Sequence, residues 1–366
     1  MSISVNQQLP DYAAPDAKSA LLAAGATGTI YSLVMPESEA ALAALVDDKA
    51  SLFDRYREPW TQKQDALHEA YFETWIEWAA PIVRFAAEDF PFRYPTAGAS
   101  EGIFKLMAEY RAQTEAPSIH IFDGEYEGFP AYAEALGLRC LRHDRARWED
   151  VVERIEQGGL FWISQPSAID GQVWDQFDAF VAFLANKRPD VAIIPDLTYV
   201  GSVARAFEIA LDAPNIPAFV TSHSKPFGGY YHRVGGVFSR TERPSLFGNK
   251  WFKNLLSLAW GTELMRRHAV FDLPRRYREV QEDAARRVGA ALGIDALHGA
   301  DVLLMGIAPP DSATTDVLRT VLRGSPSEQV VRLCLTPAMT ALIDPALAEQ
   351  TAPRLAASWQ QMGVGR

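Results

Sequence analysis

The chain has 366 residues, of which 48% are hydrophobic and 22% are charged, an ordinary globular composition that supports a sizeable core. Its formal net charge of −11 argues against nucleic acid and anionic membranes as partners. The N-terminal stretch MSISVNQQLPDY lacks a basic start followed by an apolar run, so no signal peptide is expected. Cys140 and Cys334 lie in apolar surroundings and indicate buried thiols in a reducing compartment. We therefore expect a soluble cytoplasmic protein.

The first 60 residues contain several turn signals and one predicted helix, over residues 38–46. We expect this segment to pack with a small domain rather than to fold as a domain itself. Residues 62–89 have a helical and unusually aromatic pattern. Four large side chains recur there at spacings of three and four, namely Tyr71, Phe72, Trp75 and Trp78. Such a stripe indicates core or a subunit interface more often than a ligand site.

From residue 98 to about residue 239, short apolar runs alternate with helical patterns. The predicted strands cover residues 118–122, 138–141, 160–164, 191–194, 218–221 and 234–238. The predicted helices cover residues 101–113, 129–136, 148–157 and 174–186. Buried strands that read as unbroken apolar runs between amphipathic helices indicate an α/β fold with a mostly parallel sheet covered on both faces. Ligands of such sheets bind outside the carboxyl ends of the strands.

Beyond residue 238 a long helical tract is predicted over residues 244–288, with a break near Leu273 and Pro274. The remainder reads as a small α+β unit, with strands at 302–307 and 330–335 and helices at 315–323 and 345–362. We divide the chain into an N-terminal segment (1–60), a large three-layer domain (61–275) and a C-terminal small domain (276–366).

The strongest chemical signal is the stretch TSHSKPFGGYYHRVGG at residues 221–236. Lys225 lies just beyond an apolar run, where partial desolvation can free its amine to attack a carbonyl. Ser222, Ser224 and Arg233 are groups that suit a phosphate. Together they point to a phosphorylated aldehyde, pyridoxal 5'-phosphate (PLP). Because a lone Ser-x-Ser-Lys is more often a solvated loop, this hypothesis depends on agreement with other segments.

Three other segments lie where a parallel sheet would place a ligand. Residues 96–102 (TAGASEG) lead into a helix, and the free N–H groups of such a helix start favour an anion. Tyr126 follows a predicted strand, so its ring could stack on a planar group. Asp196 also ends a strand and needs a cationic partner, which a protonated pyridine nitrogen would supply; Tyr199 follows three residues later. Each signal is weak alone.

This order of segments resembles the fold type I PLP-dependent enzymes, the aspartate aminotransferase superfamily, and most of all its class I/II aminotransferase branch. The resemblance spans about residues 94–337 and is strongest where Arg233 follows Lys225 at the family's spacing of eight. It implies that Lys225 forms the internal aldimine, a Schiff base with PLP. It also implies that Asp196 keeps the pyridine nitrogen protonated and that Tyr199 bonds the phenolic oxygen. These three residues are the implied catalytic set.

The same resemblance assigns the other contacts of the cofactor and the substrate. Its phosphate would be held by the backbone amides of Ala99 and Ser100 and by the side chains of Ser222 and Arg233. Tyr126 falls where the family's ring-stacking aromatic lies. Arg332, in the sequence VRLC, resembles the arginine that grips the substrate carboxylate, a task that suits a bidentate guanidinium fork. No metal is implied.

The chain departs from the family where an Asn-Pro-Thr-Gly segment is usual. Residues 165–171 here read QPSAIDG, and Ala168 stands at the asparagine position. Either Gln165 or Ser167 replaces the asparagine as a contact of the cofactor, or that contact is absent. His223, next to the lysine, also breaks the usual pattern. These departures indicate a divergent member with a specialised substrate.

The function implied by the resemblance is a PLP-dependent aminotransferase, a homodimer that acts on an amino acid and a keto acid in a specialised biosynthetic pathway. One alternative keeps the fold and changes the outcome to β- or γ-elimination by a carbon–heteroatom lyase. Nothing in the sequence separates the two, since the same residues serve both. A further alternative, a non-catalytic PLP-binding protein, is less favoured because no basic helix-turn-helix segment precedes residue 94.

Overall fold

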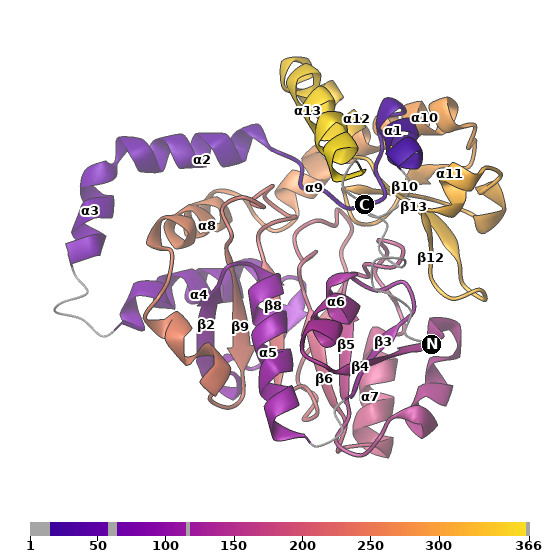
Figure 1. The fold of residues 1–366 in the computed structure, drawn as a ribbon. Coiled ribbons are helices and arrows are strands. Elements are labelled where there is room, and N and C mark those ends of the chain that lie inside the picture. Colours follow the sequence, from indigo (N-terminus) through magenta and orange to yellow (C-terminus); the bar gives the residue numbers. More distant parts are fainter. Residues whose placement is uncertain (1–14, 58–63, 115–117, 364–366) are drawn as a thin grey trace.

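A twisted seven-stranded sheet forms the centre of the computed structural model, which describes residues 15–57, 64–114 and 118–363 (Figure 1). Its strands, in spatial order, are β2 (Phe92–Thr96), β9 (Gly235–Ser239), β8 (Ala218–Ser222), β6 (Ala192–Asp196), β5 (Leu160–Ser164), β3 (Ser118–Phe122) and β4 (Arg139–His143). Strand β9 runs antiparallel to both of its neighbours, and all other neighbouring pairs are parallel. The predicted mostly parallel sheet is confirmed.

All six predicted strands of this sheet are present, two of them with the predicted bounds. Five of them, β3, β5, β6, β8 and β9, could be predicted because both of their faces are buried, which makes the runs largely apolar, whereas the edge strand β4 is partly exposed. The prediction missed β2, whose sequence FRYPT contains a charge and a proline. Pro95 is tolerated there because β2 is the edge strand.

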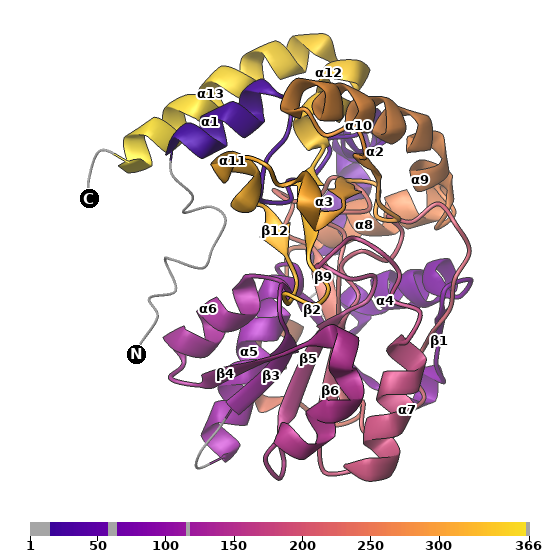
Figure 2. The same cartoon turned by 90° about the vertical axis from the view of Figure 1, so that its right-hand side faces the viewer.

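Side chains alternate between the two faces of the sheet, so each face has its own core. Ile121, Trp162 and Val220 point to the face covered by α5 (Ala99–Gln113) and α6 (Gly128–Ala135). Phe161 and Phe219 point to the other face, covered by α4 (Ala66–Ala79) and α7 (Phe177–Lys187). Figure 2 shows α5 and α6 on one side of the strands and α7 on the other. This is the expected three-layer arrangement.

The aromatic stripe belongs to the core. Phe72 and Trp75 of α4 pack on Phe238, with ring centroids 5.1 and 4.9 Å apart. The helix is shorter than the predicted span of 62–89, of which residues 62 and 63 lie outside the described residues. It ends at Ala79, just before Pro81, which cannot continue a helix, and is followed by β1 (Val83–Arg84) and a 3-10 turn, η4 (Ala87–Asp89).

Several other helix predictions were wrong in extent. Residues 148–157 belong mainly to a 3-10 segment, η5 (Arg145–Arg154), which is kinked at Arg147. Residues 315–323 form a short helix, α11 (Asp316–Arg319), and then strand β12 (Leu322–Arg323). The predicted helical tract is interrupted at residues 268–271, close to the expected break, although Leu273 and Pro274 themselves belong to a helix. The tract consists of η6 (Pro244–Lys250), α8 (Leu255–Arg267), α9 (Asp272–Arg276) and α10 (Arg278–Leu292). Pro274 is tolerated because it occupies the first turn of α9.

A smaller antiparallel sheet lies beyond the carboxyl ends of the large one. It consists of β10 (His298–Gly299), β11 (Met305–Ala308), β13 (Val330–Cys334) and β12. The helices around it are α10, α12 (Thr336–Ile343) and α13 (Pro345–Gly363). The remaining short elements are α3 (Lys49–Arg57), η7 (Pro310–Ser312) and β7 (Ile209–Ala210), which pairs with β1.

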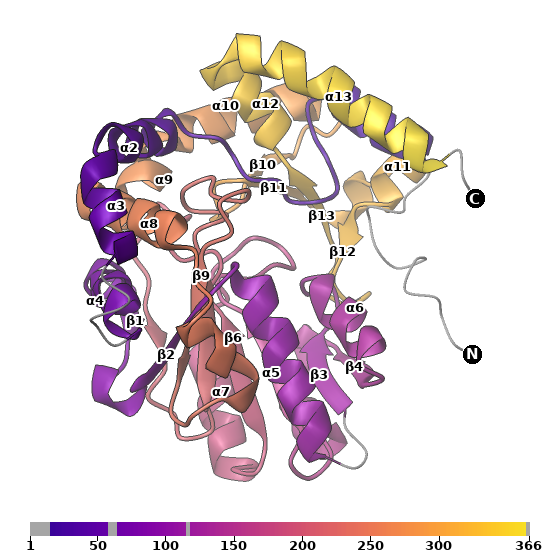
Figure 3. The same cartoon turned by 60° about the vertical axis from the view of Figure 1, so that its left-hand side comes forward.

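The N-terminal segment contacts both parts of the molecule. Helix α1 (Pro15–Ala23) lies along α13, whereas α2 (Pro36–Asp47), which confirms the helix predicted at 38–46, packs on α8 (Figure 3). Between the two helices, Thr27 forms a bridge with Cys334 of β13. The expected packing of this segment with the small domain thus describes only its first half. The domain bounds themselves remain a prediction.

Two further expectations concern the cysteines and membranes. Cys140 and Cys334 are both free thiols, and Cys334 is buried. Among the helices of the described ranges, none combines the length and apolar character that crossing a bilayer requires.

Gly228 provides a test of how tightly the N-terminal segment packs on the Lys225 turn. Its φ is +65°, and a Cβ there would lie 2.0 Å from the carbonyl oxygen of Leu33. Gly137 has a similar φ of +66° in open space. We expect Gly137→Ala to cost only the left-handed strain, about 1–2 kcal/mol, and Gly228→Ala to cost clearly more free energy of unfolding in urea titrations. Equal costs for the two variants would contradict the close packing.

Candidate functional site

A pocket of about 520 Å³ lies at the carboxyl ends of the large sheet, between that sheet and the small one. Residues from β6, β8, β13, the start of α5 and the N-terminal segment line it. The sequence-predicted residues that line it are Ala99, Ser100, Tyr126, Asp196, Tyr199, Ser222, Lys225, Arg233 and Arg332. Ligands of parallel sheets bind at this edge. Of the predicted site residues, only Ser167 is absent from the lining.

Lys225 lies three residues beyond the end of β8, and its Nζ donates a hydrogen bond to the backbone oxygen of Ile30. The N-terminal segment makes a second contact with this turn, because Ser32 Oγ donates to the backbone oxygen of Ser224 at 2.5 Å. Burial lowers the pKa of Lys225 from 10.5 to about 8. A fraction of the amine is therefore neutral and nucleophilic near neutral pH.

Asp196 is a buried carboxylate at the last position of β6. Its Oδ1 accepts hydrogen bonds from the backbone nitrogen and the hydroxyl of Thr198, at 2.9 and 2.5 Å. Within the described part of the chain both of its hydrogen bonds reach this oxygen, so Oδ2 is available to a ligand. Burial raises its pKa from 3.8 to about 6. A cation bound at Oδ2 would relieve that cost. Tyr199, three residues later, is also buried, and burial raises its pKa.

An anion cradle lies at the start of α5. The helix has Gly98 as its N-cap, with no side-chain cap, so the first N–H groups are open to a ligand. Gly98 has a φ of +81°, and a Cβ there would lie 2.7 Å from Nη2 of Arg233. Nη2 of Arg233 donates a hydrogen bond to the backbone oxygen of Ala97 at 2.5 Å. Ser222, the last residue of β8, donates from its Oγ to Ser224 Oγ at 2.9 Å.

Tyr126 forms one wall of the pocket. Its hydroxyl is 3.4 Å from Ser100 Oγ. A Cβ at Gly128 would lie 2.2 Å from its ring, so the glycine makes room for the tyrosine. The neighbouring Glu125 is buried and accepts hydrogen bonds from the hydroxyl and backbone nitrogen of Ser164, at 2.6 and 3.0 Å. Burial raises the pKa of Glu125 to about 7. This carboxyl group fastens the Tyr126 loop to the end of β5.

Arg332 reaches the pocket from β13 with its side chain only 2% exposed. Its guanidinium donates to the backbone oxygens of Ala168 and Gly28, and Nη2 lies 3.4 Å from Oε1 of Glu127. Nε of Arg332 is buried and has no hydrogen-bond partner among the described residues. The arginine is thus rigidly placed and still has unused donors.

The residues offered in place of the family's asparagine do not line the pocket. Ser167 Oγ accepts a hydrogen bond from Nη1 of Arg145 at 3.0 Å. Gln165 exchanges hydrogen bonds with the backbone of Trp174, both at 3.2 Å. Ala168 lines the pocket at the position of the asparagine, without a polar side chain. The prediction that Ser167 contacts the cofactor is therefore wrong. Ser167 belongs instead to a polar network around Arg145, and Arg145 also forms an ion pair with Asp170 at 2.5 Å.

Sequence reasoning missed several lining residues. Thr29, Ile30 and Tyr31 come from the N-terminal segment, and Lys18 from α1. The only signal for residues 29–31 was the uncharged, glycine-containing stretch over residues 21–35, which does not reveal its distant partners. Glu127 was also missed, although it follows Tyr126 directly.

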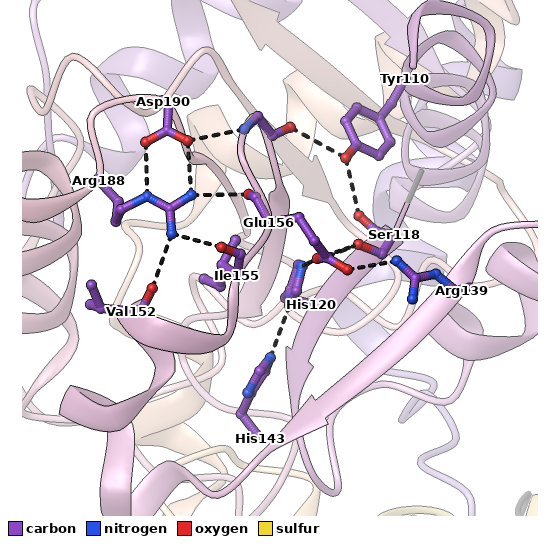
Figure 4. Close-up of polar contacts among 11 residues, drawn as sticks. Tyr110, Ser118, His120, Arg139, His143, Val152, Ile155, Glu156, Arg188 and Asp190 are labelled. Atoms are coloured by element: carbon purple, nitrogen blue, oxygen red, sulfur yellow. Dashed lines mark hydrogen bonds and ion pairs between the residues drawn. The ribbon is translucent and has the colours of Figure 1, made fainter. Parts of the chain in front are cut away.

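A second polar cluster, none of whose members lines the pocket, joins β3 and β4 to the segments that precede β5 and β6 (Figure 4). His120 contacts His143 at 2.9 Å and Glu156 at 3.0 Å, and Glu156 also binds Arg139 at 2.6 Å. Arg188 is held there by Asp190 at 2.9 Å. Arg188 also donates to the backbone oxygens of Ile155 and Glu156, at 2.7 and 3.0 Å, so the cluster joins the segment before β6 to the segment before β5.

No family model matches the chain, and no curated protein matches it in sequence. Solved structures do match its fold. A methionine aminotransferase from Escherichia coli is 13% identical with a TM-score of 0.62, and the match covers 92% of this chain and 96% of that one. An aspartate aminotransferase from Thermus thermophilus with maleate is 12% identical with a TM-score of 0.63, over 98% and 99%. A PLP-bound C–S lyase from Staphylococcus hominis is 12% identical with a TM-score of 0.63, over 88% and 90%. The fold is therefore that of the fold type I PLP-dependent enzymes, as the resemblance implied.

His223 lies beneath the Lys225 turn, in van der Waals contact with aromatic rings. Its ring centroid is 5.5 Å from that of Tyr71, 5.9 Å from Trp78 and 5.2 Å from Phe227. Neither ring nitrogen has a hydrogen-bond partner among the described residues. Burial lowers its pKa from 6.5 to about 3. The unfolded chain therefore binds the proton more tightly, and acid removes stability between pH 6.5 and about pH 3.

His223→Phe should abolish this loss. We expect the variant to lose about 2 kcal/mol less free energy of unfolding than the wild type between pH 7 and pH 5. Urea titrations at the two pH values measure the difference, and His298→Phe, at an exposed position, is the control. Parallel pH profiles for the wild type and His223→Phe would mean that His223 accepts a proton in the folded protein.

Proposed function

We propose that this protein is a PLP-dependent aminotransferase that acts on an amino acid and a keto acid. One observation carries the proposal: a single pocket gathers Lys225, the carboxylate of Asp196, an anion cradle at α5 and Arg332. These groups come from four separate elements, so their convergence is not a consequence of sequence proximity. The aminotransferases among the solved structures with this fold support the proposal.

The chain's residues fit PLP group by group. The amide groups at the start of α5, with Ser222 and Arg233, would hold the phosphate. Oδ2 of Asp196, which accepts no hydrogen bond from the residues that the structure describes, would bind the protonated ring nitrogen, and the ring of Tyr126 would stack on the cofactor. Tyr199 would bond the phenolic oxygen. Because residue 168 is alanine and not asparagine, the phenolic oxygen would have one fewer protein donor than the resemblance implies.

Each residue then has a chemical task. Bound PLP would stabilise negative charge at the α-carbon of an amino acid. Lys225 would supply the amine that holds the aldehyde carbon and, once the substrate has displaced it, the base that removes the α-proton. Asp196 would keep the ring nitrogen protonated. Arg332 grips the α-carboxylate, which disfavours its loss as carbon dioxide.

A carbon–heteroatom lyase is the second candidate, because a C–S lyase has the same fold with similar coverage. In that reaction Lys225 removes the same proton, and a β or γ substituent leaves. A non-catalytic PLP-binding protein is the least favoured alternative, since it gives Arg332 no role. A specialised biosynthetic pathway is our inference from the departures at Ala168 and His223.

The first experiment follows the visible absorbance of the purified, PLP-loaded protein during titration with single amino acids. We expect a yellow protein that one amino acid bleaches and a keto acid restores. Keto-acid release that needs no acceptor would establish the lyase instead. A protein that stays colourless with added PLP would overturn the proposal.

Lys225→Ala should lose both the visible absorbance band and turnover, because Lys225 is the lining lysine beyond the end of β8, whereas Lys18, the other lysine of the described lining, lies on α1. Lys253→Ala is the matched control. Burial likewise lowers the pKa of Lys253 to about 8, but its Nζ bonds His68 outside the pocket. If Lys225→Ala retains turnover, the lysine has been assigned wrongly.

We also propose that the protein is a homodimer. Five large aromatic residues that follow Lys225 in the sequence are exposed, namely Tyr230, Tyr231, Phe247, Trp251 and Phe252, and Tyr230 also lines the pocket. Two of them, Tyr231 and Phe252, are 87% and 86% exposed, which is costly unless a partner covers them. We expect sedimentation equilibrium to give a dimer that the double variant Tyr231→Ser, Phe252→Ser weakens. A stable PLP-loaded monomer would contradict the dimer.

A further inference from the structure

Glu127 occupies one side of the guanidinium that would grip the substrate. The residue lies at the N-terminal end of α6, directly after Tyr126, and lines the pocket. Its Oε1 lies 3.4 Å from Nη2 of Arg332 and also accepts a hydrogen bond from Nη2 of Arg323. Although burial acts to raise its pKa, the two arginines hold the pKa of Glu127 below its ordinary value. The chain thus supplies its own carboxylate beside Arg332.

The balance of charge in this subsite limits what it can hold. The side chains of Arg323 and Arg332 are 9% and 2% exposed, so their charges are weakly screened by solvent. With Glu127 ionised, two positive charges and one negative charge leave a net charge of +1. Arg323 itself does not line the pocket, and it forms an ion pair with Glu127. The subsite therefore has room for one more negative charge.

We propose that Glu127 is a specificity-determining residue that restricts the site to amino acids whose side chain carries no negative charge. This inference rests on the proposed function for the identity of the substrate as an amino acid. The α-carboxylate takes the remaining positive charge of Arg332. A second carboxylate on the same molecule then meets Glu127 in a poorly screened pocket, where juxtaposed like charges are strongly unfavourable. Neutral and cationic side chains meet no such repulsion.

The distribution of the other charges agrees with this assignment. Besides Glu127, the only acid among the lining residues is Asp196, which the ring nitrogen would occupy. Arg233 lies at the phosphate cradle and Lys225 at the aldehyde. Lys18, on α1, is the remaining cation of the described lining. If the site preferred acidic substrates, Lys18 would be the residue to pair with their side-chain carboxylate.

The test compares butyrate with succinate, two four-carbon acids that differ by one carboxylate. Isothermal titration calorimetry would measure both dissociation constants at low ionic strength, with and without PLP, so turnover is not needed. We expect the wild type to bind butyrate more tightly than succinate. Glu127→Gln should improve succinate binding relative to butyrate by about tenfold. Glu134→Gln, an exposed glutamate on the same helix, is the matched control and should leave the ratio unchanged.

Two further variants secure the interpretation. Arg323→Gln leaves Glu127 paired with Arg332 alone and should weaken the binding of both acids, an effect opposite in sign to that of Glu127→Gln. Arg332→Gln should lose the binding of both acids, which places the probes at this arginine. A wild type that prefers succinate, or a ratio that Glu127→Gln leaves unchanged, would overturn the inference. Because the effect is expected without PLP as well, it can fail or succeed independently of the absorbance experiment.

Discussion

The pocket depends on the hydrogen bonds that residues 27–38 make with two distant parts of the chain. On one side, Ile30 accepts from the amine of Lys225, and Ser38 Oγ donates to the backbone oxygen of Phe227 at 2.5 Å. On the other side, Thr27 pairs with Cys334 of β13. The segment therefore sets the position of the Lys225 turn relative to β13, the strand that carries Arg332. Neither part could hold that geometry alone, because they belong to different sheets.

The fold could be predicted where one physical requirement determined the residues. Strands β3 and β5 are buried on both faces, so their apolar runs gave the bounds directly. Helix ends were less predictable, because tertiary contacts decide them. The η5 segment reads as an amphipathic helix, yet Arg147 leaves helical geometry there. Strand β2 was not predicted, because a proline argues against a strand unless the strand lies at the edge of its sheet. The sequence does not show that β2 lies at the edge.

Site residues could be predicted from the sequence where a polar side chain directly follows or ends an apolar strand. Lys225 and Asp196 follow apolar runs, and neighbouring strand ends meet at one edge of the sheet. Ser167 sits at a similar position but turns toward Arg145, which approaches from a different loop. Glu127 gave no signal because its importance depends on Arg323, which lies almost two hundred residues away. What sequence reasoning misses here is the pairing of charges across long distances in the chain.

The reversed direction of β9 has a consequence for how the cofactor contacts are linked. A parallel strand after β8 would need a crossover of at least a dozen residues, and it would begin at the opposite edge of the sheet. Because β9 runs antiparallel to β8, the single connection over residues 223–234 both leaves and re-enters the sheet at the pocket edge, without crossing to the opposite edge. Lys225 and Arg233 lie on this single connection. The spacing between the proposed aldehyde contact and the proposed phosphate contact is thus set by the length of this connection, so inserting or deleting a residue there would shift Lys225 relative to Arg233.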